Sequence, residues 1–168
     1  LLHEASVPEF KSDIRPLCKY LITQIEKLGI PVEHKKATAA DLAGYDAVIC
    51  ATGSRPILPG VPGIDKPGVM DALEVLNGAR KPEGRIAVIG GGLVGTETAL
   101  HLAEQGMHTT LVEMLPKIMN GVAATDQLAY SERIAKADME VCTGTRLVSI
   151  GDGEITVSDH TGTHTIPA

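Results

Sequence analysis

A chain of 168 residues is long enough to bury the core of an ordinary domain, and 43% of its residues are hydrophobic. Its formal net charge of -6 argues against a nucleic-acid partner, and its 2% aromatic content argues against base stacking. No apolar run approaches the roughly 18 residues that span a bilayer, so no membrane partner is expected. Three widely spaced cysteines without a C-x-x-C pair favour a reducing, cytoplasmic setting.

The N-terminal third of the chain has the pattern of a helix between two strands. Apolar residues recur at helical spacing over residues 14–28, behind a suitable N-cap at Ser12, and Gly29 is expected to end the helix. Residues 30–36 and the apolar run 47–51 are strand candidates. Because a helix connects them, we expect the two strands to be parallel.

A stretch rich in proline and glycine, residues 54–68, follows the second strand candidate. Such a composition suits neither a helix nor a central strand, so the stretch is interpreted as a linker. A short helix is expected directly after it. The chain is therefore divided into residues 1–53, a crossover with a short helix over residues 54–83, and a second unit over residues 84–168.

The second unit begins with the alternation of strands and helices that is typical of an α/β fold. A β-branched strand over residues 86–89 precedes a helix over residues 93–105, and a strand over residues 108–113 precedes a weaker helix over residues 123–137. Residues 139–168 then alternate like strands of an antiparallel excursion. The pattern predicts a Rossmann-like domain, with flanking helices on a parallel sheet and an antiparallel β excursion.

The sequence VIGGGLVGTE places a G-x-G-x-x-G motif between this first strand and its helix. Gly90 permits a tight turn, Gly92 leaves no Cβ where a pyrophosphate approaches, and Gly95 allows close packing of the helix. The free N–H groups at the helix start suit phosphates. A glycine-rich turn without a ligand is the alternative, and the agreement of the flanking elements favours a nucleotide. The candidate phosphate site is Gly90, Gly91, Gly92, Leu93, Val94 and Gly95.

An acidic residue ends the next strand. Glu113 stands where a carboxylate accepts hydrogen bonds from the adenosine ribose hydroxyls. A carboxylate there repels a 2'-phosphate, so NAD is favoured over NADP. Lys117 is the residue that softens this preference if its side chain reaches the ribose; a solvated loop lysine is its simpler interpretation.

Three segments of the chain resemble one family. VIGGGLVGTETALHLAEQGMHTTLVEM resembles the NAD-binding half of flavoprotein reductases with two dinucleotide-binding domains. FKSDIRPLCKYLITQIEKLGIPVE and YDAVICATGSRPILPGVPG resemble the late part of the flavin-facing domain and the crossover to the NAD domain. The resemblance extends from about Pro8 to Ala168. It is strongest to the C-terminal part of NADH:flavin oxidoreductases such as 2,4-dienoyl-CoA reductase, 2-enoate reductase and trimethylamine dehydrogenase.

The resemblance implies that the chain is an internal piece of a longer parent. The family carries an earlier glycine motif for FAD or ADP, and none precedes Gly29, so residues 1–53 would be the tail of an incomplete flavin-binding domain. The flavin and barrel domains of the parent would then be partners, and NADH in the cleft would pass a hydride to the flavin. A cleft that holds only ADP, as a structural or regulatory ligand, remains the alternative.

The resemblance also gives roles to individual residues. Thr52 and Gly53 would approach the flavin nucleotide, although a plain strand end is an equal interpretation. Glu97 would lie near the nicotinamide, although a carboxylate in the first helical turns also suits the helix macrodipole. Since the flavin does the redox chemistry, no catalytic side chain is expected, and the histidines show no metal-ligand spacing.

Two further expectations concern exposure. Cys50 and Cys142, in predicted strands, are expected to be buried and unreactive. The helix face around Leu17, Leu21 and Ile25 would lack the packing partner that the rest of a flavin domain supplies, so we expect the chain to associate with copies of itself.

Overall fold

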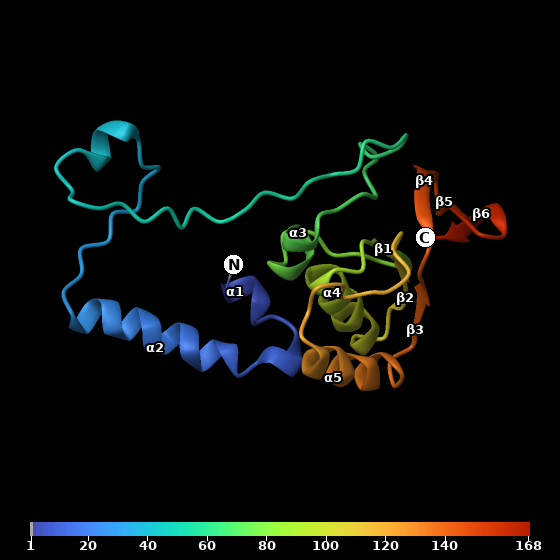
Figure 1. Cartoon of the computed structure of the whole chain (residues 1–168), viewed down its shortest axis with the longest axis horizontal. Helices are drawn as coiled ribbons and strands as arrows, with labels where there is room; N and C mark the ends of the chain where they lie inside the picture. Colours follow the sequence, from blue (N-terminus) through green and yellow to red (C-terminus); the bar gives the residue numbers. More distant parts are fainter. Residues whose placement is uncertain (1) are drawn as a thin grey trace.

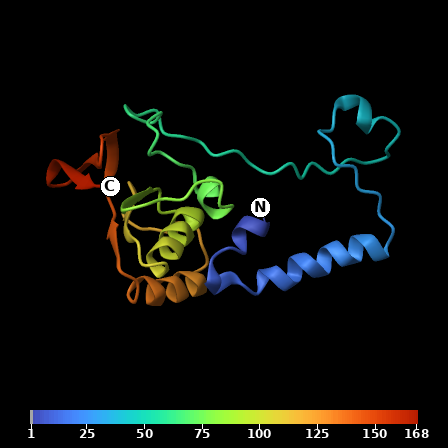
Figure 2. The ribbon, with the colours of Figure 1, turned by 180° about the vertical axis from the view of Figure 1, so that it is seen from behind.

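The computed structural model describes residues 2–168. A long arm and a layered body make up the molecule (Figure 1). The chain begins beside the body with α1 (Leu2–Ala5) and η1 (Glu9–Lys11), and the arm that follows contains α2 (Ile14–Lys27) and η2 (Ala39–Leu42). The view from behind in Figure 2 shows α2 leading away from the body, with an extended segment returning along the same direction.

Helix α2 confirms the predicted helix, but it begins after Asp13 rather than Ser12, and Asp13 makes no side-chain capping bond. Its C-terminal end is closed by Gly29, whose φ of +62° suits glycine, and the Ile30 N–H donates to the Ile25 carbonyl. No residue of α2 is buried. The helix therefore has an apolar face without a packing partner among the described residues.

The two predicted strands of the N-terminal third do not form, so this prediction and the parallel pairing are wrong for the structure. Residues 30–36 and 47–51 have no strand geometry, and Ile49 is 91% exposed. A strand requires a neighbour for its N–H and C=O groups, and no described strand lies beside these segments. For the same reason Cys50 is exposed, contrary to expectation, while Cys142 is half-buried.

The linker is neither helix nor strand until α3 (Ala72–Leu76), as predicted. Its second half is held against the body: the Ile150 N–H donates to the Pro62 carbonyl at 2.9 Å, and a Cβ on Gly63 would lie 2.2 Å from the Ile150 oxygen. Lys66 forms an ion pair with Asp152 at 2.6 Å. The crossover thus enters the body along a fixed path.

Three parallel strands in the order β1-β2-β3 form the central sheet of the body. They are β1 (Arg85–Ile89), β2 (His108–Val112) and β3 (Met139–Cys142). Helices α4 (Leu93–Glu104) and α5 (Ala124–Ile134) supply the crossovers. The buried residues of α4 include Ala99, Leu102 and Ala103, which lie on the face that packs on β1 and β2.

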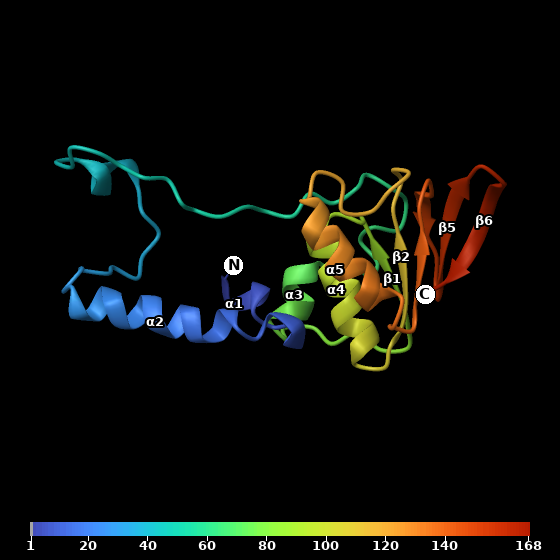
Figure 3. The ribbon, with the colours of Figure 1, turned by 60° about the horizontal axis from the view of Figure 1, so that its bottom comes forward.

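A second, antiparallel sheet contains β4 (Arg146–Ile150), β5 (Glu154–Asp159) and β6 (Gly162–Pro167) in sequence order. Figure 3 shows helices, central sheet and this second sheet as successive layers. A buried cluster of Val112, Leu147, Ile155 and Val157 joins the two sheets. The predicted fold class is confirmed: a parallel sheet with flanking helices and an antiparallel excursion.

Candidate functional site

The glycine motif forms the turn at the carboxyl ends of β1 and β2. Gly90 has a φ of +102°, a conformation that favours glycine, and its N–H donates to the Val112 carbonyl at 2.8 Å. A Cβ on Gly95 would lie 1.8 Å from the Gly90 carbonyl oxygen. These two glycines are therefore required by the turn and by the close approach of α4.

Gly92 is different, because neither packing nor backbone conformation requires a glycine there. A Cβ on Gly92 would meet nothing within 4 Å, and its φ of -66° is ordinary for any residue. Gly92 is the N-cap of α4 and supplies no side-chain cap, so no side chain from the N-cap accepts the first N–H groups of the helix. Leu93 and Val94, 39% and 57% exposed, begin the helix at the surface.

Glu113, at the end of β2, is buried beside this turn. Its Oε2 accepts the Gly91 N–H at 2.6 Å, and its Oε1 accepts the Leu115 N–H at 2.7 Å. Each carboxylate oxygen retains a lone pair for a further donor. The carboxylate therefore holds the turn in shape and stands next to the open helix N-terminus.

The loop after β2 folds back over the turn. The Met119 N–H donates to the Gly91 carbonyl at 2.6 Å, and Gln127 donates to the carbonyls of Met119 and Val122. Met119 has a φ of +54° and is 2% exposed, so the loop is packed as well as hydrogen-bonded. Lys117, on the same loop, is exposed.

Glu97 lies in α4, five residues beyond Gly92 and about 7.5 Å along the helix axis. Its side chain is buried and its Oε1 accepts the Lys11 ammonium at 2.7 Å and the Tyr130 hydroxyl. Burial raises the pKa of Tyr130 above its ordinary value, and the hydrogen bond to Glu97 adds to the increase. Sequence reasoning missed Lys11 and Tyr130, which lie 86 and 33 positions from Glu97.

Thr52 and Gly53 are not brought to the glycine turn. Both are exposed in the extended segment that runs outside the body (Figure 1). Gly53 has a φ of +77°, so glycine is favoured there by the backbone itself. The structure thus groups Gly90 to Gly95, Glu97 and Glu113 in the body and leaves this pair in the arm.

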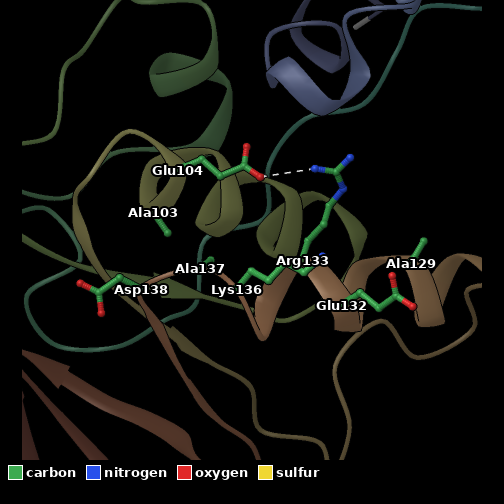
Figure 4. Close-up of a pocket in the computed structure, with 8 residues that line it drawn as sticks. All are labelled: Ala103, Glu104, Ala129, Glu132, Arg133, Lys136, Ala137 and Asp138. Carbon is green, nitrogen blue, oxygen red and sulfur yellow. Dashed lines mark ion pairs between the residues drawn. The ribbon is translucent and has the colours of Figure 1, made fainter.

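A hollow of about 490 Å³ lies between the C-terminal halves of α4 and α5 (Figure 4). Alanines 103, 129 and 137 line it, together with charged residues that include an Arg133–Glu104 ion pair at 3.5 Å. The helix α4 separates it from the glycine turn by about 18 Å. The hollow is therefore not part of the candidate nucleotide site.

Neither a metal site nor a membrane span is found in the part of the chain that the structure describes. Within residues 2–168, no group of three or more histidine, cysteine, aspartate or glutamate side chains is placed to hold a metal ion. No described helix is long and apolar enough to cross a membrane.

The strand, glycine turn, helix and buried acid define a Rossmann-like dinucleotide-binding unit. Residues 6–168 match the model of the family described as pyridine nucleotide-disulphide oxidoreductase. The chain belongs to this family. Its members use FAD and NAD(P)H, so the predicted resemblance to flavoprotein reductases is confirmed at this level.

Several oxidoreductases are similar to the chain. It is 33% identical over 99% of its length to a bilirubin reductase of Mediterraneibacter gnavus, of which it covers 26%. It is 39% identical over 67% of its length to a cinnamate reductase of Clostridium sporogenes, covering 17% of that protein, and 34% identical over 85% to an NADH oxidase of Thermoanaerobacter brockii, covering 23%. The chain thus spans about a quarter or less of these relatives.

A solved structure of 2-naphthoyl-CoA reductase in complex with 2-naphthoyl-CoA also resembles the chain. The TM-score is 0.91 at 29% identity, over 99% of this chain and 26% of that one. A TM-score this high over nearly the whole chain means that the arm and the body are arranged similarly in the matched part of that reductase.

Proposed function

We propose that the chain is the NAD(H)-binding module of a flavin-dependent oxidoreductase and holds NADH for hydride transfer to a flavin. The observation that carries this proposal is the open space at Gly92. Since the protein itself does not require a glycine there, the missing Cβ is explained by a ligand that approaches the backbone. A pyrophosphate at the uncapped N-terminus of α4 satisfies this requirement.

The residues at the glycine turn would contact two groups of the dinucleotide, the pyrophosphate and the adenosine ribose. The N–H groups at Gly92 to Gly95 would bind the pyrophosphate, and Glu113 would accept the hydroxyls of the adenosine ribose. NAD is preferred over NADP because a 2'-phosphate would meet the Glu113 carboxylate. The flavin supplies the redox chemistry, and the side chains of this module orient the nucleotide and need no acid, base or nucleophile.

We further propose an enoate reductase-like parent that works in the cytoplasm. Relatives named for bilirubin, cinnamate and 2-naphthoyl-CoA support this type of reductase, to which the predicted likeness to 2,4-dienoyl-CoA reductase also points. In such a parent, residues 1–53 belong to the flavin-binding domain, residues 54–83 to the crossover and residues 84–168 to the NAD domain. FAD, and barrel domains with the substrate site, are then the partners of this module.

One observation favours a second candidate, a module that binds ADP without hydride transfer. The carboxylate of Glu97, expected near the nicotinamide, already accepts Lys11 and Tyr130 through one oxygen. By contrast, Gly92, Leu93 and Val94 at the proposed pyrophosphate site are exposed. Such a module would serve a structural or regulatory purpose.

Calorimetric titration of the chain with NADH and with ADP separates the two functions. Contacts to the nicotinamide half would make NADH bind more tightly than ADP, whereas equal affinities favour the ADP module. In the full-length parent, NADH should bleach the flavin absorbance under anaerobic conditions. A flavin that stays oxidised would contradict hydride transfer.

A further inference from the structure

The short segment of residues 6–11, which we name the latch, packs on the body just before the arm leaves it. Ser6 is 6% exposed, and Pro8 is among the fully buried side chains. The Phe10 ring meets the Tyr130 ring edge-on, with 6.0 Å between centroids, and the Arg133 guanidinium lies 5.0 Å above Phe10. The latch is therefore seated on α5 by apolar and aromatic contacts.

The latch also reaches α4 through a charge. The Lys11 ammonium donates to Glu97 at 2.7 Å, and both side chains are largely shielded, at 21% and 10% exposure. Tyr130 donates its hydroxyl to the same Glu97 oxygen. Separating a shielded ion pair leaves each charge without a partner in a site that water reaches poorly, which costs more free energy than separating an exposed pair. The Lys11–Glu97 pair therefore holds the latch in one geometry.

On its other side the latch is bonded to the start of α2. The Arg15 guanidinium donates to the carbonyls of Ser6 and Val7 at 2.9 and 3.0 Å and to the Glu9 carboxylate at 3.1 Å. These bonds connect the first turn of α2 to the same six residues that pack on the body. Since α2 itself buries no residue, its direction depends on these bonds together with the contacts of α1, which touches both α2 and α3.

We infer that the latch fixes the direction of the arm relative to the nucleotide-binding body, and that Lys11 is its positioning residue. Arg15 joins α2 to the latch, and Lys11 joins the latch to α4, the helix whose N-terminus presents the phosphate site. The crossover at Pro62 to Lys66 is a second attachment, but a long extended segment separates it from α2 (Figures 1 and 2). This inference does not require a bound nucleotide.

The distance between arm and body tests the inference. Spin labels at Glu26→Cys on α2 and Glu132→Cys on α5, with Cys18, Cys50 and Cys142 replaced by Ser, Ser and Ala, report that distance by pulsed electron resonance. Labelled chain diluted with unlabelled chain removes distances between copies. With the intact latch, the distance distribution should have one narrow peak. Lys11→Met should broaden this distribution while the circular-dichroism spectrum stays unchanged.

Two variants make the test specific. Lys11→Arg keeps the charge and should keep the narrow distance, and Lys19→Met removes an exposed lysine of α2 and should change nothing. If Lys11→Met does not fold, Glu97→Gln removes the charge that holds Lys11 and should broaden the distance in its place. A narrow distance in every folded variant, or a broad distance with the latch intact, would overturn the inference.

Discussion

Gly91 and Glu113 are packed so closely that each restricts the other. The Gly91 N–H donates to Glu113 Oε2 at 2.6 Å, and a Cβ on Gly91 would lie 2.9 Å from the Glu113 Cβ and 2.7 Å from Ile118 Cγ2. Gly91 occupies a variable position of the G-x-G-x-x-G motif, so the motif alone gives no reason for a glycine there. The reason is steric, and it lies in the next strand and its loop.

The first prediction follows from this contact. Gly91→Ala should lower the free energy of unfolding by about 1–3 kcal/mol, because the methyl group overpacks a buried site. Gly92→Ala is the matched control, since its methyl group meets open space. Its free energy of unfolding should stay within about 0.5 kcal/mol of that of the unsubstituted chain. Urea denaturation followed by circular dichroism measures both. Equal stability of the two variants would contradict the steric argument.

The second prediction concerns the phosphate site. Gly92→Val should abolish NADH binding and leave the fold largely intact, because the branched side chain fills the space proposed for the pyrophosphate. Fluorescence or calorimetric titration with NADH provides the measurement, and Gln105→Ala is a suitable control, because Gln105 is exposed at the opposite end of the same helix. A folded Gly92→Val chain with unchanged affinity would remove the phosphate role from this turn.

The third prediction concerns cofactor choice. Glu113→Ala would remove the ribose acceptor, and the structure shows that it would also free the N–H groups of Gly91 and Leu115. Glu113→Gln is the milder change, because it keeps one acceptor oxygen for these N–H groups while its NH2 group replaces the other. It should weaken NADH binding roughly ten- to hundredfold, or about 1.5–3 kcal/mol, and leave NADPH unchanged or slightly tighter.

The control for this prediction is Lys117→Met, which should weaken only NADPH if the lysine reaches a 2'-phosphate. Competitive titrations with both nucleotides give the comparison. If the unsubstituted 168-residue chain already prefers NADPH, the assignment of Glu113 to the ribose is wrong and Lys117 is the next residue to test.

The sequence predicts best those elements that are determined by residues close together in the chain. The strand, glycine turn and helix from Arg85 to Glu104 follow one another directly, and hydrophobic periodicity with three glycines predicts them. The apolar run 47–51 has the same local signal, but a strand also needs a neighbour, and the described residues give it none. The exposure of this run was therefore not predictable from its own composition.

The latch shows a second limit. The family resemblance implies that Glu97 lies near the nicotinamide, but its partners in the structure come from η1 and α5. Nothing in the spacing of Lys11 or Tyr130 indicates the other, because pairs so distant in sequence are determined by packing.

The fourth prediction is that the chain associates with itself through α2. Leu17, Leu21 and Ile25 are 47%, 40% and 38% exposed and recur along one face of the helix. Leu21→Lys should shift the equilibrium toward monomer, because a charge in the contact is costly to bury. Sedimentation velocity over a range of concentrations measures the shift, with Lys19→Met as the control. A monomer at all concentrations would contradict the prediction.

The fifth prediction is that the chain binds NADH but purifies without flavin. A tight FAD site needs a glycine turn and helix N-terminus of its own for the pyrophosphate, and residues 2–53 of the structure contain no strand that leads into such a turn. Thr52 and Gly53 are exposed and supply one wall at most. Half a site loses most of the contacts and keeps the entropic cost of fixing a large ligand. The visible absorption spectrum of the purified chain should therefore lack the flavin bands, and adding FAD before gel filtration should not restore them. A yellow chain with stoichiometric flavin would show that residues 2–53 form a working flavin site in solution.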